Sequence, residues 1–248
     1  MKSQWLKIQW IVGGSALTLL NLAVSFGRPF PVQAAAITLL DGTPCTGNFQ
    51  GRSGTGICVY SQVDQTGTAY DYYRGQIQNG IPSGTGVFVY TNGDRYEGQV
   101  RNGRPNGRGM FLFADNNRYE GEFKDGEFSG RGTFTYANGG RYTGQLLRGQ
   151  PHGSGTLVDG QYTYAGQFYL GQINGNGTIS NRNGIRCQGV FYNNQLSGKG
   201  TCSYPQGNAI RSYNGELRRG IPDGRGTMVM RNGNRISGEF RDGQPLRR

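Results

Sequence analysis

Apolar and polar positions alternate along most of the chain with a period of two residues. In the segment Tyr96 to Arg101, an aromatic, a glycine and a valine share one face of an extended strand, and the charged and amide residues share the other. The residues from Asn102 to Asn106 are typical of a turn, and Gly107 to Phe113 returns as a second strand. The pattern therefore predicts a β-hairpin.

The register of this hairpin follows from its glycines. We expect Gly98 to face Gly109, Tyr96 to face Phe111 and Val100 to face Gly107. Each bulky side chain would then lie over a glycine or beside another aromatic ring. A single hairpin is marginally stable in water, so neighbouring hairpins must supply the stability.

The hairpin pattern recurs along the chain, and most copies are 23 residues apart. Each copy has an opening glycine, and a Gly-x-Gly in most copies ends eleven residues later, as in Gly107-Arg108-Gly109. The opening glycines are Gly47, Gly75, Gly98, Gly121, Gly144, Gly166, Gly189, Gly215 and Gly238. This recurrence is the mark of a repeat protein.

The repeated pattern Tyr-x-Gly-x-x-x-x-Gly-x-x-x-Gly-x-Gly resembles the MORN repeat family (membrane occupation and recognition nexus) over residues 45–245, about eight full copies and a half copy. The resemblance implies an all-β fold, an elongated single-domain solenoid of antiparallel β-hairpins. It also implies a scaffold or attachment module. The first, fifth and seventh copies depart from the pattern in length, and no residues remain to build a catalytic domain.

Composition agrees with a Gly-rich β architecture. The 248 residues include 45 Gly, 15 Tyr and 12 Phe but only 9 Pro. Gly has no three-residue period, which excludes collagen. So much Gly would also destabilise a helical bundle by about 1 kcal/mol for each occurrence.

Residues 1–34 differ from the repeats and predict a secretory signal peptide. Lys2 and Lys7 give a basic start, an apolar centre follows, and Val32 and Ala34 stand at the −3 and −1 positions of a cleavage site. We expect cleavage after Ala34, a short linker over 35–44, the repeats over 45–248, and export to the periplasm or the extracellular space. The alternative is an uncleaved membrane anchor formed by residues 8–26.

Four cysteines occupy matched positions in two copies. Cys45 lies two residues before an opening glycine and Cys58 two residues after a Gly-x-Gly, and Cys187 and Cys202 repeat this arrangement. In the expected register each pair is directly cross-strand, with Cα atoms about 4.5 Å apart. The sequence therefore predicts disulfides Cys45–Cys58 and Cys187–Cys202. Four buried free thiols are the alternative.

Basic residues also recur at fixed repeat positions. The chain has a net charge of +11 at pH 7. One row precedes the opening aromatic position, and another occupies the middle of Gly-x-Gly. The candidate residues for binding an anion or a partner are Arg95, Arg118, Arg141, Arg186 and Arg235 in the first row and Arg108, Arg131 and Arg225 in the second. Such rows can bind an anionic surface, or they can simply keep the chain soluble.

The sequence gives little sign of catalysis. His152 stands at an expected turn position, no helix follows any Gly-x-Gly to make a phosphate site, and no metal or cofactor motif occurs. A carboxylate pair among the polar-face glutamates is the remaining catalytic hypothesis. These glutamates are Glu97, Glu120, Glu122, Glu216 and Glu239.

Three functions follow, in order of preference. The first is a non-catalytic exported scaffold for an unidentified protein partner. The second is peripheral binding of anionic lipid or an envelope polysaccharide through the Arg rows. The third is an enzyme that uses a carboxylate pair. Nucleic acid is not expected as a partner, because an exported chain seldom meets it.

Overall fold

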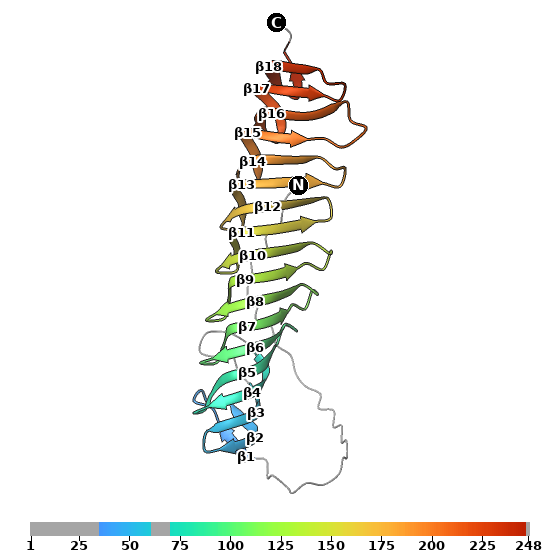
Figure 1. The fold of residues 1–248 in the computed structure, drawn as a ribbon. Coiled ribbons are helices and arrows are strands. Elements are labelled where there is room, and N and C mark those ends of the chain that lie inside the picture. Colours follow the sequence, from blue (N-terminus) through green and yellow to red (C-terminus); the bar gives the residue numbers. More distant parts are fainter. Residues whose placement is uncertain (1–34, 61–69, 247–248) are drawn as a thin grey trace. The chain divides into compact units, whose positions relative to one another are not determined.

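The computed structural model describes residues 35–60 and 70–246, and these residues form strands and turns without a helix. The predicted signal peptide lies outside them. Contacts divide the chain into two compact units, the first ending at Glu127 and the second beginning at Phe128. Within each unit the strands follow one another in chain order (Figure 1). The expected all-β array of antiparallel hairpins is confirmed.

In the first unit each strand is antiparallel to the next. Its strands are β1 (Ala35–Thr38), β2 (Pro44–Gln50), β3 (Ser53–Val59), β4 (Tyr70–Gln78), β5 (Ile81–Tyr90), β6 (Arg95–Arg101), β7 (Arg104–Leu112) and β8 (Arg118–Lys124). We expected residues 35–44 to be a linker, but β1 lies within this segment and pairs with β2. Exposure alternates along Ala-Ala-Ile-Thr, and this segment extends the sheet by one strand.

The second unit continues the same antiparallel pattern. Its strands are β9 (Glu127–Thr135), β10 (Arg141–Leu147), β11 (Gln150–Asp159), β12 (Tyr162–Tyr169), β13 (Gln172–Asn181), β14 (Arg186–Tyr192), β15 (Gln195–Ser203), β16 (Ile210–Arg218), β17 (Ile221–Met230), β18 (Arg235–Arg241) and β19 (Gln244–Pro245). His152 lies in β11, and its predicted place in a turn was wrong.

The hairpin of β6 and β7 confirms two of the three expected pairs. Gly98 faces Gly109 and Tyr96 faces Phe111. Val100, however, pairs with Pro105 and not with Gly107, because a β-bulge shifts the register after Gly98.

The bulge is accompanied by a contact from the polar residue that follows the opening glycine. Gln99 Oε1 accepts the backbone N–H of Arg108 at 2.7 Å. The Gln99 side chain then lies against Gly107, whose φ of +97° is in the region that favours glycine. The same amide contact recurs between Gln145 and the N–H of Ser154.

The turn of this hairpin is also shorter than expected. Only Asn102 and Gly103 separate β6 from β7, with φ values of +51° and +76°. Two consecutive positive φ values match the two-residue turn whose twist suits a hairpin. Pro105, expected in the turn, is therefore a strand residue.

The core geometry that recurs from repeat to repeat is a tyrosine ring lying over two paired glycines. A Cβ atom added to Gly109 would meet the Tyr96 ring at 2.5 Å, and one added to Gly98 would meet the Tyr96 hydroxyl at the same distance. The hydroxyl donates to the Gln99 carbonyl at 2.6 Å. Tyr96 is completely buried. Glycine at both positions thus makes room for the ring and for its hydrogen bond.

The tyrosine of one repeat also contacts an aromatic side chain of the next. The rings of Tyr96 and Phe123 lie 4.9 Å apart, centre to centre, in an edge-to-face arrangement. In the second unit, Tyr164 meets Phe191 in the same manner at 4.9 Å. Such pairs contribute about 0.5–1.5 kcal/mol beyond area burial. They couple neighbouring hairpins that would be marginal alone.

Replacing Tyr96 by Phe should lower the free energy of unfolding by about 1 kcal/mol, because it removes the hydroxyl donor and leaves the Gln99 carbonyl without this bond. Urea unfolding followed by circular dichroism measures the change. Tyr72→Phe is the matched control, since Tyr72 is exposed and should change stability by less than about 0.5 kcal/mol. Equal effects of the two substitutions would contradict the interpretation.

Alkaline pH should destabilise the protein through the same tyrosines. Burial raises the pKa of Tyr164 to about 12 and raises the pKa values of Tyr73, Tyr96 and Tyr119 above their ordinary value. In the unfolded chain these phenols titrate near pH 10. The contribution of these tyrosines to the free energy of unfolding is complete below about pH 10. It is lost as the pH rises towards their pKa values in the folded protein. We expect a flat melting temperature from about pH 7 to 9 and a fall above about pH 10. A melting temperature that stays constant to about pH 11 would refute this expectation.

Candidate functional site

The sheet of each unit has two different faces. The inward face carries the tyrosines and the paired glycines, and the outward face carries the residues on either side of each opening glycine. In β6 the inward residues Tyr96 and Val100 are buried, whereas Glu97 and Gln99 are exposed. Because the inward face is filled, a macromolecular ligand has access chiefly to the outward face.

The first Arg row lies on the outward face and is partly neutralised. Arg95 forms an ion pair with Glu97 at 2.6 Å, and Arg118 forms one with Glu120 at 2.7 Å. The other members of the row are exposed and form no ion pair with another residue of the described chain; they are Arg141, Arg186 and Arg235. The structure thus divides this row into paired and unpaired members.

The second Arg row occupies the middle of Gly-x-Gly, also on the outward face. Arg108 faces Glu122 in the register, and Arg225 Nε donates to Glu239 Oε1 at 2.9 Å. Arg131 is exposed in β9. Opposite charges therefore alternate across neighbouring strands here, which weakens the hypothesis of a purely cationic surface.

The outward glutamates are bound to cations or to backbone groups. Glu97, Glu120 and Glu239 form the ion pairs described above, and Glu216 Oε2 accepts the Arg225 N–H at 3.3 Å. All of these side chains are exposed. None of them lines the three hollows described below, whereas a glycosidase needs two carboxylates in one cleft.

The outward face of the first unit combines apolar and charged side chains. Two cross-strand rows run over β3 to β8, and we call them together the first-unit ladder. One row is Ile57, Arg74, Val87, Glu97, Met110 and Glu120, and the other is Val59, Tyr72, Val89, Arg95, Leu112 and Arg118. Val59 is 58% exposed and Ile57 is 45% exposed, whereas Val87 is buried. Sequence analysis missed this patch, although apolar residues at outward strand positions were visible in the sequence.

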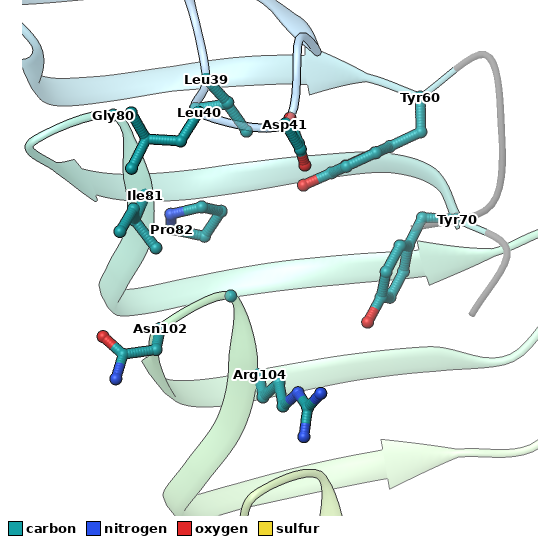
Figure 2. A pocket seen from close by; sticks show the side chains of 11 residues that line it. Leu39, Leu40, Asp41, Tyr60, Tyr70, Gly80, Ile81, Pro82, Asn102 and Arg104 are labelled. Atoms are coloured by element: carbon teal, nitrogen blue, oxygen red, sulfur yellow. The ribbon is translucent and has the colours of Figure 1, made fainter. Parts of the chain in front are cut away.

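A small hollow lies in the same unit, where the segment after β1 meets later turns. It has a volume of about 260 Å³. Leu39 and Pro82 line one side and Tyr60 and Tyr70 the other (Figure 2). Its lining mixes apolar, aromatic and charged side chains.

Metal chemistry has no visible support in residues 35–60 and 70–246. No three His, Cys, Asp or Glu side chains there lie close enough together to hold a metal ion. In the second unit, Arg218 donates to Asp223 at 2.7 Å and holds the pKa of that carboxyl below its ordinary value. No helix among the described residues is long and apolar enough to cross a membrane.

Comparison with known families identifies the repeated hairpin. The MORN repeat model matches seven consecutive segments: 73–95, 96–118, 119–141, 142–162, 164–186, 187–209 and 213–235. The chain belongs to the MORN repeat family. The family model begins at residue 73, but the β2–β3 hairpin before it has the same facing glycines, Gly47 and Gly56. The MORN architecture therefore extends beyond the matched segments.

Other comparisons add little to the MORN assignment. No curated protein matches the chain significantly. The TCP domain of SAS-4 (dCPAP) from Drosophila melanogaster, in complex with a proline-rich motif of Ana2 (dSTIL), aligns at 12% identity over 79% of this chain and 98% of that chain, with a TM-score of 0.35. The G-box domain of the microcephaly protein CPAP aligns at 12% identity over 84% and 99%, with a TM-score of 0.29. Such low scores do not establish a common fold.

Two MORN hairpins carry cysteines in place of the tyrosine core. Cys45 faces Cys58 and Cys187 faces Cys202, with Cα atoms 4.1 and 4.0 Å apart. The sulfur atoms are 2.07 and 2.12 Å apart, at disulfide distance. In the second of these hairpins a Leu196 methyl lies over Gly189, where a tyrosine ring lies in other repeats.

Peptide mapping of the unreduced protein should find the disulfides Cys45–Cys58 and Cys187–Cys202. Replacing Cys187 and Cys202 together by Ser should lower the free energy of unfolding by about 2–3 kcal/mol, because the bond limits the freedom of the unfolded chain. Chemical unfolding of the oxidised protein measures this loss. Free thiols in the native protein, or a bridge between the two hairpins, would contradict the pairing.

Proposed function

We propose that this MORN-repeat chain is a non-catalytic, exported scaffold that binds a protein partner through the first-unit ladder. The observation that supports this most is the outward exposure of Val59, Tyr72 and Leu112 beside arginines and glutamates. Aromatic and Arg side chains are enriched where proteins bind one another. Exposed apolar patches on a soluble surface also mark interaction sites.

The charge pattern favours a protein over anionic lipid at this surface. Arg95 and Arg118 each contact a carboxylate of the same strand. A lipid surface would have to compete with these intramolecular pairs and would approach the carboxylates as well. A protein partner can present both signs of charge to match them.

Export is supported by chemistry from two parts of the chain. The cysteine pairs at disulfide distance are compatible with an oxidising compartment. The sequence of residues 1–34 has the basic start, apolar centre and small-residue site of a signal peptide. A scaffold in the periplasm or outside the cell is consistent with both.

Cross-linking of the mature chain in its native envelope, followed by mass spectrometry, should capture a protein that contacts the first-unit ladder. Tyr72→Ala combined with Leu112→Ala should reduce its recovery about tenfold, because the truncation removes buried contact area from the interface. Ile221→Ala is the matched control, since it truncates an exposed apolar side chain in the second unit.

Equal recovery with the double variant and the control would overturn the proposed surface. The lipid alternative is measured separately with vesicles that contain phosphatidylglycerol. Tight binding that disappears in high salt and with Arg141→Ala and Arg186→Ala would favour the Arg rows instead.

A further inference from the structure

Over β9 to β13, one row on the outward face of the second unit differs from the first-unit ladder because hydroxyl side chains dominate it. A cross-strand row runs Thr133, Thr143, Thr156, Ala165, Thr178 over β9 to β13. A shallow groove of about 860 Å³ lies beside this row. Gln145, Gln167 and Asn176 also line it, and Arg131 is the single charged residue in its lining among the residues that the structure describes.

A second hollow, of about 430 Å³, continues this groove across β11 to β13. The two hollows share Ser154 and Gln167. In the second hollow the rings of His152 and Tyr169 lie 5.5 Å apart, beside Asn174. Tyr169 is 58% exposed, so one side of its ring is open to a ligand.

His152 and Gln167 give this region defined polar groups. His152 Nδ1 is buried and has no hydrogen-bond partner in the described chain. A buried polar atom of this kind costs free energy until a partner reaches it. Gln167 Oε1 accepts the Asn176 N–H at 2.8 Å, which fixes the orientation of the Gln167 amide at the floor of the groove.

An aromatic platform recurs one repeat further along the same face. Tyr192 stands three residues after its opening glycine, as Tyr169 does, and is 67% exposed. Phe168 and Phe191 point inward, so both tyrosines point outward. Since two strand spacings separate them, the rings are expected about 10 Å apart. This is close to the length of two sugar rings in an extended β-1,4-linked chain.

We propose that this face binds an uncharged, extended polysaccharide chain. Tyr169 and Tyr192 would stack on the apolar C–H faces of alternate sugar rings, because each aromatic ring offers a large apolar surface with a polar hydroxyl at one end. The amides of Gln167 and Asn174 offer both donors and acceptors to sugar hydroxyls. The His152 ring lines the same hollow beside Tyr169.

Charge and geometry favour a glycan over other macromolecules here. An anionic polymer would need more than the single arginine of the groove. A lipid surface would require apolar side chains where this groove has Thr, Gln and Asn. The groove includes only Arg131 from the Arg rows and no residue of the first-unit ladder, so its test is independent of the proposed protein partner.

Isothermal titration of the purified mature chain with cellohexaose, xylohexaose, mannohexaose and maltohexaose tests the proposal. We expect at least one extended β-linked hexasaccharide to bind, with an affinity that is the same at low and high salt. Tyr169→Ala and Tyr192→Ala should each weaken binding about tenfold, because each removes one stacking ring. Tyr169→Phe should retain binding, since the ring remains.

Ile221→Ala, which truncates an exposed side chain of the same unit away from the groove, should bind as the unchanged protein does. Melting temperatures of all variants confirm that each is folded. Failure of every β-linked oligosaccharide to bind would overturn the proposal. So would binding that both alanine variants retain, or binding that is confined to an anionic polymer and lost in high salt.

Discussion

The fold depends on one steric constraint: in most repeats a tyrosine ring lies across two paired glycines. Tyr96 can occupy this place only because Gly98 and Gly109 have no side chain, and its hydroxyl then reaches the carbonyl of Gln99. The ring is held from below by backbone and at its edge by Phe123 of the next repeat. Packing and hairpin coupling therefore have a single origin, and glycine, which usually weakens strands, here makes the core possible.

The cysteine hairpins show a second solution to the same constraint. Where Cys187 and Cys202 replace the aromatic pair, the glycines remain, but the space above Gly189 is filled by Leu196. In the first hairpin, Phe49 of β2 lies over Gly56 of β3, the other glycine of the pair. Two features together replace the tyrosine in these hairpins. One is the covalent cross-link, and the other is an aliphatic or aromatic side chain from the strand opposite the covered glycine. The backbone pairing of the glycines stays the same.

The sequence was sufficient to predict the hairpins, the facing glycines and the proximity of the cysteines, because all of these depend on the spacing of residues within one repeat. The bulge was missed because the alternation of apolar and polar residues does not indicate an unpaired residue between Gly98 and Val100. The Gln99 contact with Arg108 that accompanies the bulge is not visible in that alternation either. The outward surfaces were missed for a different reason. Val59 and Tyr72 become neighbours only through pairing between hairpins. In the sequence, each is a single apolar or aromatic residue at a position where a polar residue is expected.

The division between the two faces explains how one architecture can carry different surfaces. Inward residues are constrained by the tyrosine and glycine geometry, whereas an outward position requires only a residue that is compatible with an extended strand. Tyr72 and Val89 pair at outward positions in the first unit, and Thr163 and Ser180 pair at the equivalent positions in the second. Because such changes leave the inward packing intact, they alter what the surface binds without altering the fold. Membership of the family therefore constrains the backbone, and the chemistry of the outward rows must be read separately in each unit.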